Sequence, residues 1–452
     1  MRIFFAITGQ LGYGGLVQQS VILVKYLREF GCDVFTLVGF APPYNDEVDL
    51  DELDYTFEAF NVADYVLRDK PPFVRWLLGW YARHQLAKND SLKFKRPNNS
   101  AASMIEVDTR KVLQDLMYNP DEGAIEKVSK LHRDFKPDID YACELSLAGY
   151  FGIFDGLGTP LVVSAQGYEI CQRRGVDMVP LIRANADRID AVVSGSHANV
   201  RENVARDLPF LLPKVHVIPY GIVNDHHYEM SMEEAERRTR KFVQKSDDFT
   251  VISLGRMDVE KGVDLALHAI RMLLDEGVRV RLRVVGDWPM NEHYYPVLQE
   301  KIGMMDLQDN VDCIGFVESK ADKVALLKTS DAMLATFIKS EPFGLVLCEA
   351  MAAGIPVISP DTGAGSEILE WNGLTSGVIY RTQDTGQMAD RIRYLVDYPE
   401  ERKGMGRNGA LAVQQHFNAR RMARDILELF EDLVERRDAS RRTSFLKPSA
   451  VV

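Results

Sequence analysis

Residues 340–354 constrain the fold of this 452-residue chain more than any other stretch. An apolar segment, 333–338, precedes the stretch, and another, 355–359, follows it. Between them an apolar helical pattern ends at Gly354, a residue type that often follows the last turn of a helix. This order of strand, loop, helix and strand is a βαβ unit, which joins two parallel strands of one sheet.

Two glutamates occupy this unit, Glu341 in the loop and Glu349 in the helix, eight positions apart. Gly344 lies where the loop enters the helix and lets a ligand approach the backbone closely. The N–H groups of a first helical turn bind anions or hydroxyl groups, and carboxylates beside them accept hydrogen bonds from sugar hydroxyls. The unit therefore suits a phosphorylated sugar. For a glutamate pair taken alone, two solvated surface residues would be the alternative interpretation.

Strand and helix patterns alternate along both halves of the chain. The expected strands are 1–8, 32–38, 138–144, 160–165, 191–194 and 215–218, then 250–254, 281–285, 311–314, 333–338, 355–359 and 377–380. Each set predicts a parallel sheet covered by helices, so the predicted fold class is α/β. We place the domain boundary after Ile222, where a Pro-Tyr-Gly turn gives way to polar sequence. The expected parts are domains 1–222 and 223–417, an amphipathic helix 418–435 that packs towards the first domain, and a polar tail 436–452.

A glycine-rich loop that ends in Gly14 and Gly15 follows the first expected strand and precedes a helix. This is the layout of a phosphate-binding βα unit. A dinucleotide site needs the spacing G-x-G-x-x-G, and Val17 stands where the third glycine belongs. The spacing therefore argues against an NAD-dependent oxidoreductase, and the glycines by themselves are also consistent with a tight turn.

The composition narrows the classes of partner and of site. The formal net charge of −12 argues against nucleic acid, because phosphate binding needs a basic surface. The five cysteines form no C-x-x-C pair, which indicates reduced thiols rather than a disulfide framework or a zinc site. The sequence shows neither a signal peptide nor a long apolar run, and we expect a cytoplasmic protein.

Two other patterns have weak functional interpretations. The D-x-D pairs Asp49/Asp51 and Asp138/Asp140 resemble metal-binding pairs, but such pairs are common by chance. We therefore expect no essential metal and no cofactor. Residues 73–87 place aromatic residues near one helical face, with basic residues soon after. A helix that packs on its own domain or covers the acceptor is favoured there over contact with a membrane surface.

Arg256 and Lys261 fall in one predicted loop after a strand. Ligands collect at the carboxyl ends of strands in an open parallel sheet, and this loop, the Glu341 loop and the loop 363–367 all lie at such ends. Two cations near glycines and a helix N-terminus would hold a diphosphate and neutralise the charge that grows on it as it leaves. Taken singly, each cation would be interpreted as a solvated surface charge.

These motifs together resemble one family. They are the Gly-Gly after the first strand, the I-P-Y-G-I turn, L-G-R-x4-K-G, V-V-G-D, E-P-F-G-x4-E-A-M-A-A-G-I-P-V-I and the closing amphipathic helix. The set is similar to that of the retaining glycosyltransferases of the GT-B fold, in particular the glycogen-synthase-like family, called family 4 in the sequence classification. The resemblance implies two Rossmann-like domains that face a central cleft. It places a nucleotide-sugar donor mainly on the C-terminal domain and the acceptor mainly on the N-terminal domain.

The resemblance also implies roles for residues that match the family motifs. Arg256 and Lys261 would bind the distal phosphate of the donor, and with Glu341, which contacts hydroxyls of the donor sugar, they form the expected catalytic group. Glu349 would accept hydrogen bonds from the ribose. The other expected donor contacts are Gly14, Gly15, Gly286, Val317 and the backbone N–H groups of Phe343, Gly344 and Leu345.

One loop departs from the family pattern. Many relatives carry a histidine after the strand that corresponds to 160–165, and this chain has Gln166 there, followed by Gly167 and Tyr168. Glutamine can hydrogen-bond a hydroxyl but cannot titrate near neutral pH. Gln166 and Tyr168 are therefore expected to contact the sugar or the acceptor without a proton-transfer role. In the front-face mechanism proposed for the family the leaving phosphate can take the acceptor proton, so the change need not abolish transfer.

The leading prediction is a retaining glycosyltransferase of the hexosyltransferase type. It would move a sugar from a UDP- or GDP-linked donor to a hydroxyl acceptor with an α-linkage, and the acidic balance favours a small soluble or glycan acceptor. A homodimer is neither favoured nor excluded. The alternatives are a sugar-nucleotide epimerase or hydrolase on the same fold, and a catalytically silent protein that binds sugar nucleotides.

Overall fold

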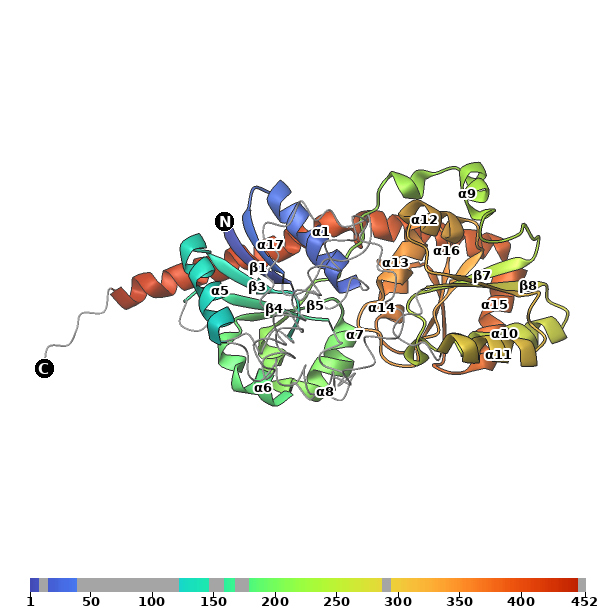
Figure 1. Ribbon diagram of the computed structural model, residues 1–452, viewed down its shortest axis with the longest axis horizontal. Helices are drawn as coiled ribbons and strands as arrows, with labels where there is room; N and C mark the ends of the chain where they lie inside the picture. The colour runs from blue at the N-terminus through green and yellow to red at the C-terminus, as the bar shows by residue number, and fades with distance from the viewer. Residues whose placement is uncertain (8–14, 39–121, 146–157, 167–178, 287–293, 446–452) are drawn as a thin grey trace, which may run out of the picture. The chain divides into compact units, whose positions relative to one another are not determined.

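The structure is a computed structural model that describes residues 1–7, 15–38, 122–145, 158–166, 179–286 and 294–445 (Figure 1). The chain divides into two compact units. Unit 1 comprises Met1–Val193, Pro213–Val215 and Glu428–Val452, and unit 2 comprises Ser194–Leu212 and His216–Leu427. The predicted domain boundary after Ile222 and the predicted role of the last helix remain predictions.

The sheet of the N-terminal half has six strands in the order β2-β1-β3-β4-β5-β6. Its strands are β1 (Arg2–Ile7), β2 (Asp33–Val38), β3 (Ile139–Ala142), β4 (Leu161–Ala165), β5 (Ala191–Ser194) and β6 (Val215–Val217). The pairs β1/β2, β1/β3 and β3/β4 are parallel. Helices α1 (Gly15–Glu29), α5 (Glu122–Phe135) and α6 (Val179–Ala184) belong to the same part of the chain. The predicted parallel α/β organisation is therefore confirmed here.

Unit 2 contains a second six-stranded sheet, in the order β14-β11-β10-β7-β8-β9, and all five pairings are parallel. The strands are β7 (Phe249–Leu254), β8 (Val280–Val285), β9 (Val311–Gly315), β10 (Ala332–Leu334), β11 (Val357–Pro360) and β14 (Gly377–Tyr380). The larger helices are α9 (Met232–Thr239), α10 (Val263–Asp275), α11 (Tyr294–Met304), α12 (Lys320–Lys328), α13 (Leu345–Ala352), α15 (Thr385–Asp397), α16 (Pro399–Gln415) and α17 (Ala419–Phe445), of which the last continues into unit 1. Figure 1 shows α10, α11 and α15 on one face of this sheet and α12, α13 and α16 on the other.

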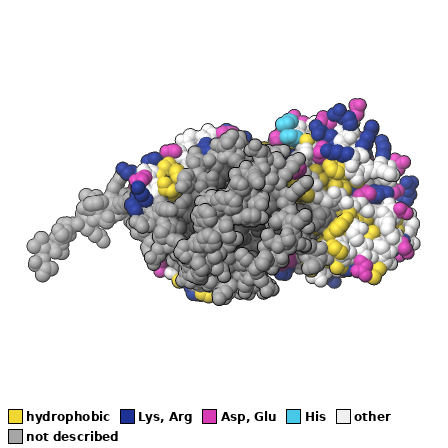
Figure 2. Space-filling view, viewed as in Figure 1, with side chains coloured by type: hydrophobic (Ala, Val, Ile, Leu, Met, Phe, Trp, Pro, Cys, Tyr) yellow, Lys and Arg dark blue, Asp and Glu magenta, His cyan; other side chains and the backbone are white. Residues whose placement is uncertain are grey.

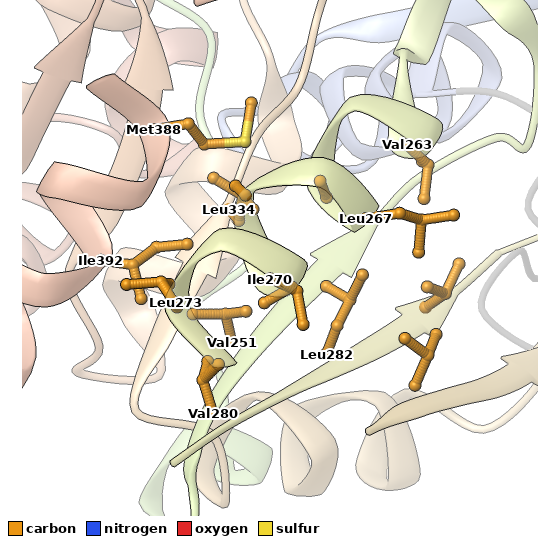
Figure 3. Packing of buried hydrophobic residues seen from close by; sticks show 14 of the residues in the cluster. Val251, Val263, Leu267, Ile270, Leu273, Val280, Leu282, Leu334, Met388 and Ile392 are labelled. Atoms are coloured by element: carbon orange, nitrogen blue, oxygen red, sulfur yellow. The ribbon is translucent and has the colours of Figure 1, made fainter. Parts of the chain in front are cut away.

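The core of unit 2 forms because apolar residues recur at helical spacing in α10 and fill β7 and β8. Val263, Leu267, Ile270 and Leu273 of α10 and Val251 of β7 belong to one buried cluster, and Figure 3 labels all five. Each of these five side chains is at most 1% exposed. The remaining labelled members of the cluster in Figure 3 are Val280, Leu282, Leu334, Met388 and Ile392. Burial of such side chains contributes about 1.5–3 kcal/mol each, which fixes the sheet and therefore the loops at its edge.

The strand order of unit 2 reverses between β7 and β10, which are hydrogen-bonded neighbours. The chain leaves β7 for β8 and β9 on one side, then returns to β10, β11 and β14 on the other. The loops after β7 and β10 therefore diverge from adjacent strands. In open α/β sheets this reversal is the point at which ligands bind.

Two elements differ in length from the sequence-based expectation. The strand expected at 333–338 ends at Leu334, because the chain leaves the sheet and Ile338 N–H donates to Glu260 O in the loop after β7 (3.1 Å). The closing helix, expected to end at residue 435, runs to Phe445. No helix in the described part of the chain is both long and apolar enough to cross a membrane. Figure 2 shows basic and acidic side chains mixed over the described surface, with many of the basic ones near α9.

Candidate functional site

The Glu341 loop leads directly into α13. Gly344 is the N-cap residue of that helix and has φ of +85°, a left-handed conformation that glycine adopts without a steric penalty. Phe343 is 4% exposed, and its ring lies 5.2 Å from that of Tyr220 and 6.1 Å from that of Phe417. The buried ring anchors the loop, so the backbone at the start of α13 is held in one place.

The backbone N–H groups at the start of α13 can bind an anion. Within the described residues, the N–H groups of Phe343, Gly344 and Leu345 donate no hydrogen bond to the protein. A helix N-terminus carries partial positive charge, and its first N–H groups have no partner within the helix. The position predicted to bind part of the nucleotide sugar therefore offers backbone N–H groups as hydrogen-bond donors.

Lys261 and Glu341 form an ion pair at the point where the strand order reverses. The Lys261 Nζ atom lies 2.5 Å from Glu341 Oε2, and the two side chains are 17% and 19% exposed. The ammonium group also lies 4.5 Å from the centre of the Phe337 ring. The structure thus brings together two of the three residues predicted to be catalytic.

Arg256 lies in the same loop as Lys261 and pairs with Asp258, with 3.3 Å between Arg256 Nη1 and Asp258 Oδ2. Asp258 also caps the short 3-10 helix η9 (Val259–Lys261) by accepting from Lys261 N–H (3.1 Å). Gly262 follows with φ of +60°, and a Cβ atom on it would lie 2.5 Å from Thr336 O. The loop is therefore packed tightly against the segment that follows β10.

Glu349 lies one helical turn into α13 and pairs with a residue that the sequence analysis did not identify. The Lys323 Nζ atom of α12 lies 3.1 Å from Glu349 Oε1, and both side chains are more than four-fifths buried. Nothing in the motifs pointed to Lys323, because the lysine and the glutamate are 26 positions apart and meet only when α12 packs beside α13. The available signal was the position of Lys323 directly before the apolar run Val324–Leu327, which is buried in α12.

Gly286 and Val317 follow β8 and β9 at the same sheet edge. Gly286 N–H donates to Gly315 O (2.9 Å). A Cβ atom on Gly286 would lie 1.7 Å from Gly255 O, so any side chain there would collide with the loop after β7. Gly286 therefore allows the loops after β7 and β8 to approach each other. Val317 is half-buried beside Phe316, which is 46% exposed.

A third loop, residues 361–364, follows β11 and contacts the Glu341 loop. Ala364 N–H donates to Glu341 O (3.0 Å). Gly363 has φ of +71°, and a Cβ atom on it would lie 2.4 Å from both the N and the O atoms of Glu341. Only a residue without a side chain can sit this close to the backbone of Glu341.

Several predicted site residues belong to unit 1 or lie outside the described part of the chain. Gly15 begins α1, and Gln166 follows β4, where its Nε2 atom donates to Ser164 Oγ (2.8 Å). Both residues belong to unit 1. Gly14, Tyr168 and residues 73–87 lie outside the described residues.

The described D-x-D pair has structural contacts. Asp138 Oδ2 accepts from Arg2 N–H (2.8 Å), and buried Asp140 pairs with His132 (2.7 Å). A different group offers ligands that could hold a metal ion: within the described residues, only Asp225, His226 and His227 bring three ligand atoms within 4.8 Å of one another. Asp225 already contacts Lys320 (2.8 Å) and His227 (2.9 Å), which compete with a cation for its oxygens.

The arrangement in unit 2 is a set of paired charges around backbone donors. Three cations each contact one carboxylate, in the pairs Lys261–Glu341, Arg256–Asp258 and Lys323–Glu349. Such a site can bind a phosphorylated ligand by exchange, because phosphate oxygens replace carboxylates as partners of the cations. The released carboxylate oxygens can then accept hydrogen bonds from hydroxyl groups.

Comparison with known proteins agrees with this architecture. Residues 234–412 match the family model described as Glycosyl transferases group 1. Spore coat protein SA of Bacillus subtilis is 29% identical over 184 residues, which are 40% of this chain and 48% of that protein. D-rhamnosyltransferase WbpZ of Pseudomonas aeruginosa is 28% identical over 267 residues, 58% of this chain and 65% of that protein. The chain thus spans about half to two thirds of the length of these curated relatives.

A solved structure shares the fold over almost the whole chain. HepE of Anabaena, crystallised in complex with UDP, has a TM-score of 0.67 to this structure at 17% identity, with 96% of this chain and 100% of that chain covered. At that identity the likeness shows the fold. Two Rossmann-like sheets of six strands each, with this likeness, confirm the predicted GT-B fold class.

Proposed function

Residues 234–412 belong to the group 1 glycosyl transferases within a chain of GT-B fold, and from this premise we propose that the protein is a retaining glycosyltransferase. Its donor is a nucleoside-diphosphate sugar, UDP- or GDP-linked, and its acceptor is a hydroxyl group of a small soluble molecule or a glycan. The product carries an α-linkage. The protein works in the cytoplasm, without an essential metal or a cofactor.

One observation carries the proposal: Lys261 and Glu341 meet at the reversal of strand order, beside the N-terminus of α13. A nucleoside-diphosphate sugar presents an anion and a ring of hydroxyls side by side, and this pair offers a cation and a carboxylate side by side. The donor phosphate binds Lys261, Arg256 and the N–H groups of α13, and the sugar hydroxyls donate to Glu341. Binding therefore exchanges one ion pair for contacts to both parts of the donor.

In the reaction step, the bond between the anomeric carbon and the phosphate oxygen breaks and a bond to the acceptor oxygen forms on the same face. The acceptor proton passes to the departing phosphate oxygen, and the nucleoside diphosphate leaves. Negative charge grows on the diphosphate as the bond breaks, and the fixed cations Lys261 and Arg256 stabilise that charge. The chain needs no titrating base in this step, which is consistent with a glutamine at position 166.

Glu349 binds the ribose hydroxyls of the donor, and Lys323 holds the carboxylate in place. The contact of 3.1 Å between Lys323 Nζ and Glu349 Oε1 orients the carboxylate, and a carboxylate makes stronger hydrogen bonds to hydroxyl donors than a neutral acceptor does. The ribose does not react, so this contact contributes binding energy equally before and during the chemical step.

Two alternatives share this donor site. A sugar-nucleotide epimerase or hydrolase would act on the donor without an acceptor hydroxyl, and a silent binding protein would hold the donor unchanged. The match of residues 234–412 to the transferase model favours transfer over both.

The proposal is tested by incubating the purified chain with UDP- and GDP-sugars, with and without a mixture of hydroxyl acceptors. Release of nucleoside diphosphate that requires an acceptor, with a product whose anomeric coupling in proton NMR is that of an α-linkage, supports retaining transfer. Donor-only formation of an epimer or of free sugar would identify the first alternative. Donor binding by calorimetry without any turnover would identify the second, and a β-linked product would contradict retention.

A further inference from the structure

A network of buried polar side chains connects the end of β5 to the Glu341 loop. None of these side chains has a role in the donor site described above. Its members are Ser194, Ser196, Asn199 and Asn203, each at most 1% exposed. All belong to unit 2, as does the Glu341 loop. Buried polar groups are costly unless they are hydrogen-bonded, so a group of four on one short segment requires an explanation.

The hydrogen bonds link these four side chains to one another and, through Ser196, to the Glu341 loop. Asn203 Nδ2 donates to Asn199 Oδ1 (2.9 Å), and Asn199 Nδ2 donates to Ser194 Oγ (3.0 Å). Asn199 N–H donates to Ser196 Oγ (2.9 Å), so that Ser196 caps the helical turn that follows it. Ser196 Oγ then donates to Pro342 O at 2.6 Å. Pro342 is the residue directly after Glu341.

The same segment holds the Glu341 loop and its neighbour at three further points. Asn203 Nδ2 lies 3.5 Å from Ser340 Oγ, on the other side of Glu341. Glu202 Oε2 accepts from Gly363 N–H (3.0 Å), and Gly363 is the glycine that touches the backbone of Glu341. Glu367 accepts from the N–H groups of His197 and Ala198 (3.0 and 3.1 Å). Residues on both sides of Glu341 are therefore fixed by residues 196–203.

We propose that Ser196 is a positioning residue for transfer: its hydroxyl fixes the Pro342 carbonyl and thereby the aim of the Glu341 carboxylate at the donor sugar. This inference rests on the proposed function. Proline has no N–H group and a restricted φ, so the backbone at residue 342 has few other ways to be held. The Ser196 hydroxyl supplies a neutral, directional bond to the loop that is separate from the Lys261–Glu341 contact.

The test compares Ser196→Ala and Ser196→Thr with the unmodified protein, using the best donor and acceptor from the activity screen. Ser196→Ala removes the bond to Pro342 O, and we expect kcat to fall about tenfold to a hundredfold, since misplacement of a reacting group by about 1 Å costs about that much. Ser196→Thr keeps the hydroxyl and should retain kcat within about threefold. Affinity for the free nucleoside diphosphate, measured by calorimetry, should change less than about threefold in both variants, because Glu341 contacts the sugar.

Two further variants separate positioning from a general loss of stability. Ser231→Ala removes a matched N-cap, in which Ser231 accepts from Glu234 N–H (3.2 Å) at the start of α9, far along the chain from the donor loops. It should lower Tm and leave kcat unchanged. In a Glu341→Ala background, the added Ser196→Ala substitution should lower kcat by less than about twofold, because the carboxylate that Ser196 positions is already absent.

The outcomes distinguish the two proposals. An active unmodified protein whose kcat is unaffected by Ser196→Ala overturns the positioning role and leaves the proposed function intact. A full additional loss from Ser196→Ala in the Glu341→Ala background also overturns it, because Ser196 would then act independently of Glu341. An unmodified protein that turns over no donor overturns the proposed function and the inference together.

Discussion

Glu341 and Glu349 carry the same charge eight positions apart, but the structure gives them different lysine partners, Lys261 and Lys323. Under the proposed function Glu341 contacts the sugar, whose bond to phosphate breaks, and Glu349 contacts the ribose, which does not react. Interactions that strengthen in the transition state raise kcat, whereas uniform binding lowers KM. The two glutamates should therefore respond differently to the same substitution.

The first prediction follows from this difference. Glu341→Ala should lower kcat roughly ten- to a thousandfold, if a charged hydrogen bond of about 1.5–3 kcal/mol is lost in a closed site. Glu349→Ala should mainly raise the KM for the donor and weaken binding of the free nucleoside diphosphate. Steady-state kinetics and calorimetry of both variants provide the measurement. Loss of diphosphate affinity in Glu341→Ala but not in Glu349→Ala would reverse the two roles.

The second prediction concerns Lys323. Lys323→Ala leaves Glu349 buried without its cation, and we expect affinity for the nucleoside diphosphate to fall about five- to fiftyfold with little change in kcat. Lys328→Ala is the matched control, because Lys328 lies on the same helix and donates to Tyr228 O (2.7 Å), away from Glu349. Equal effects of the two substitutions on diphosphate affinity would show that Lys323 acts only by stabilising α12.

At the scale of elements, the donor site depends on how closely the four loops after β7, β8, β10 and β11 approach each other at the edge of the second sheet. Glycines at positions 262, 286 and 363 allow the approach, since a Cβ atom on each would lie 2.5 Å or less from the backbone of a neighbouring loop. Contacts this short do not occur for real side chains, so the loops would have to separate. The positions of Lys261 and Glu341 are therefore set by the packing of loops as well as by the strands.

Gly363→Ala provides the third prediction. Both Gly363 and Gly277 have positive φ, so alanine at either costs roughly 1–2 kcal/mol in backbone strain. At Gly277 nothing lies within 4 Å of the added methyl group, but at Gly363 the methyl group meets the backbone of Glu341. We expect Gly363→Ala to lower both Tm and kcat, and Gly277→Ala to lower Tm alone. Equal kcat values in the two variants would show that the loop adapts without moving Glu341.

The fourth prediction uses the segment between α16 and α17. His416 stacks on Trp371 (5.7 Å between ring centres), and burial, with a smaller effect of Arg421, lowers the pKa of its imidazole below the ordinary value of 6.5. Because the pKa of His416 is lower in the folded state, the neutral imidazole contributes to the stability of the fold at pH values above the ordinary pKa. This contribution is lost as the pH falls through the lowered pKa, because the unfolded chain then binds the proton more readily.

The measurement is Tm between pH 7.5 and 5 for the unmodified protein and for His416→Gln. The Tm of the unmodified protein minus the Tm of the variant should be largest near pH 7.5 and should shrink towards pH 5. His268→Gln is the control, because His268 is an exposed histidine of α10 in the same unit. A Tm difference that does not vary with pH would show that His416 does not titrate differently on folding.

At the scale of the whole molecule, the fifth prediction is that transfer needs no divalent metal. Fixed cations in unit 2 can balance the charge of the leaving diphosphate, and the only three-ligand group found in the described residues is Asp225, His226 and His227, whose carboxylate already binds Lys320. Activity should be unchanged, within about twofold, after treatment with EDTA and transfer to metal-free buffer. Activity that EDTA abolishes and that one added metal restores would contradict the prediction.

The sequence by itself determined the fold class, the element order and most strand positions. Strands and helices can be separated in this sequence because parallel strands buried on both faces are short continuous apolar runs, whereas the helices are longer and carry apolar residues at helical spacing. Strands β5 (Ala191–Ser194) and β14 (Gly377–Tyr380) were predicted to the residue. The Lys261 and Glu341 positions were predicted as one site because loops after parallel strands share one sheet edge.

Only the tertiary structure decided which side chains are partners. The order β14-β11-β10-β7-β8-β9 makes β7 and β10 neighbours, although their last residues, Leu254 and Leu334, are 80 positions apart, and no local pattern records that pairing. The contacts of Lys323 with Glu349 and of Ser196 with Pro342 join residues 26 and 146 positions apart. Local propensity has a range of a few residues, whereas these contacts arise when whole helices and loops pack, and the packing is fixed by burial summed over the core.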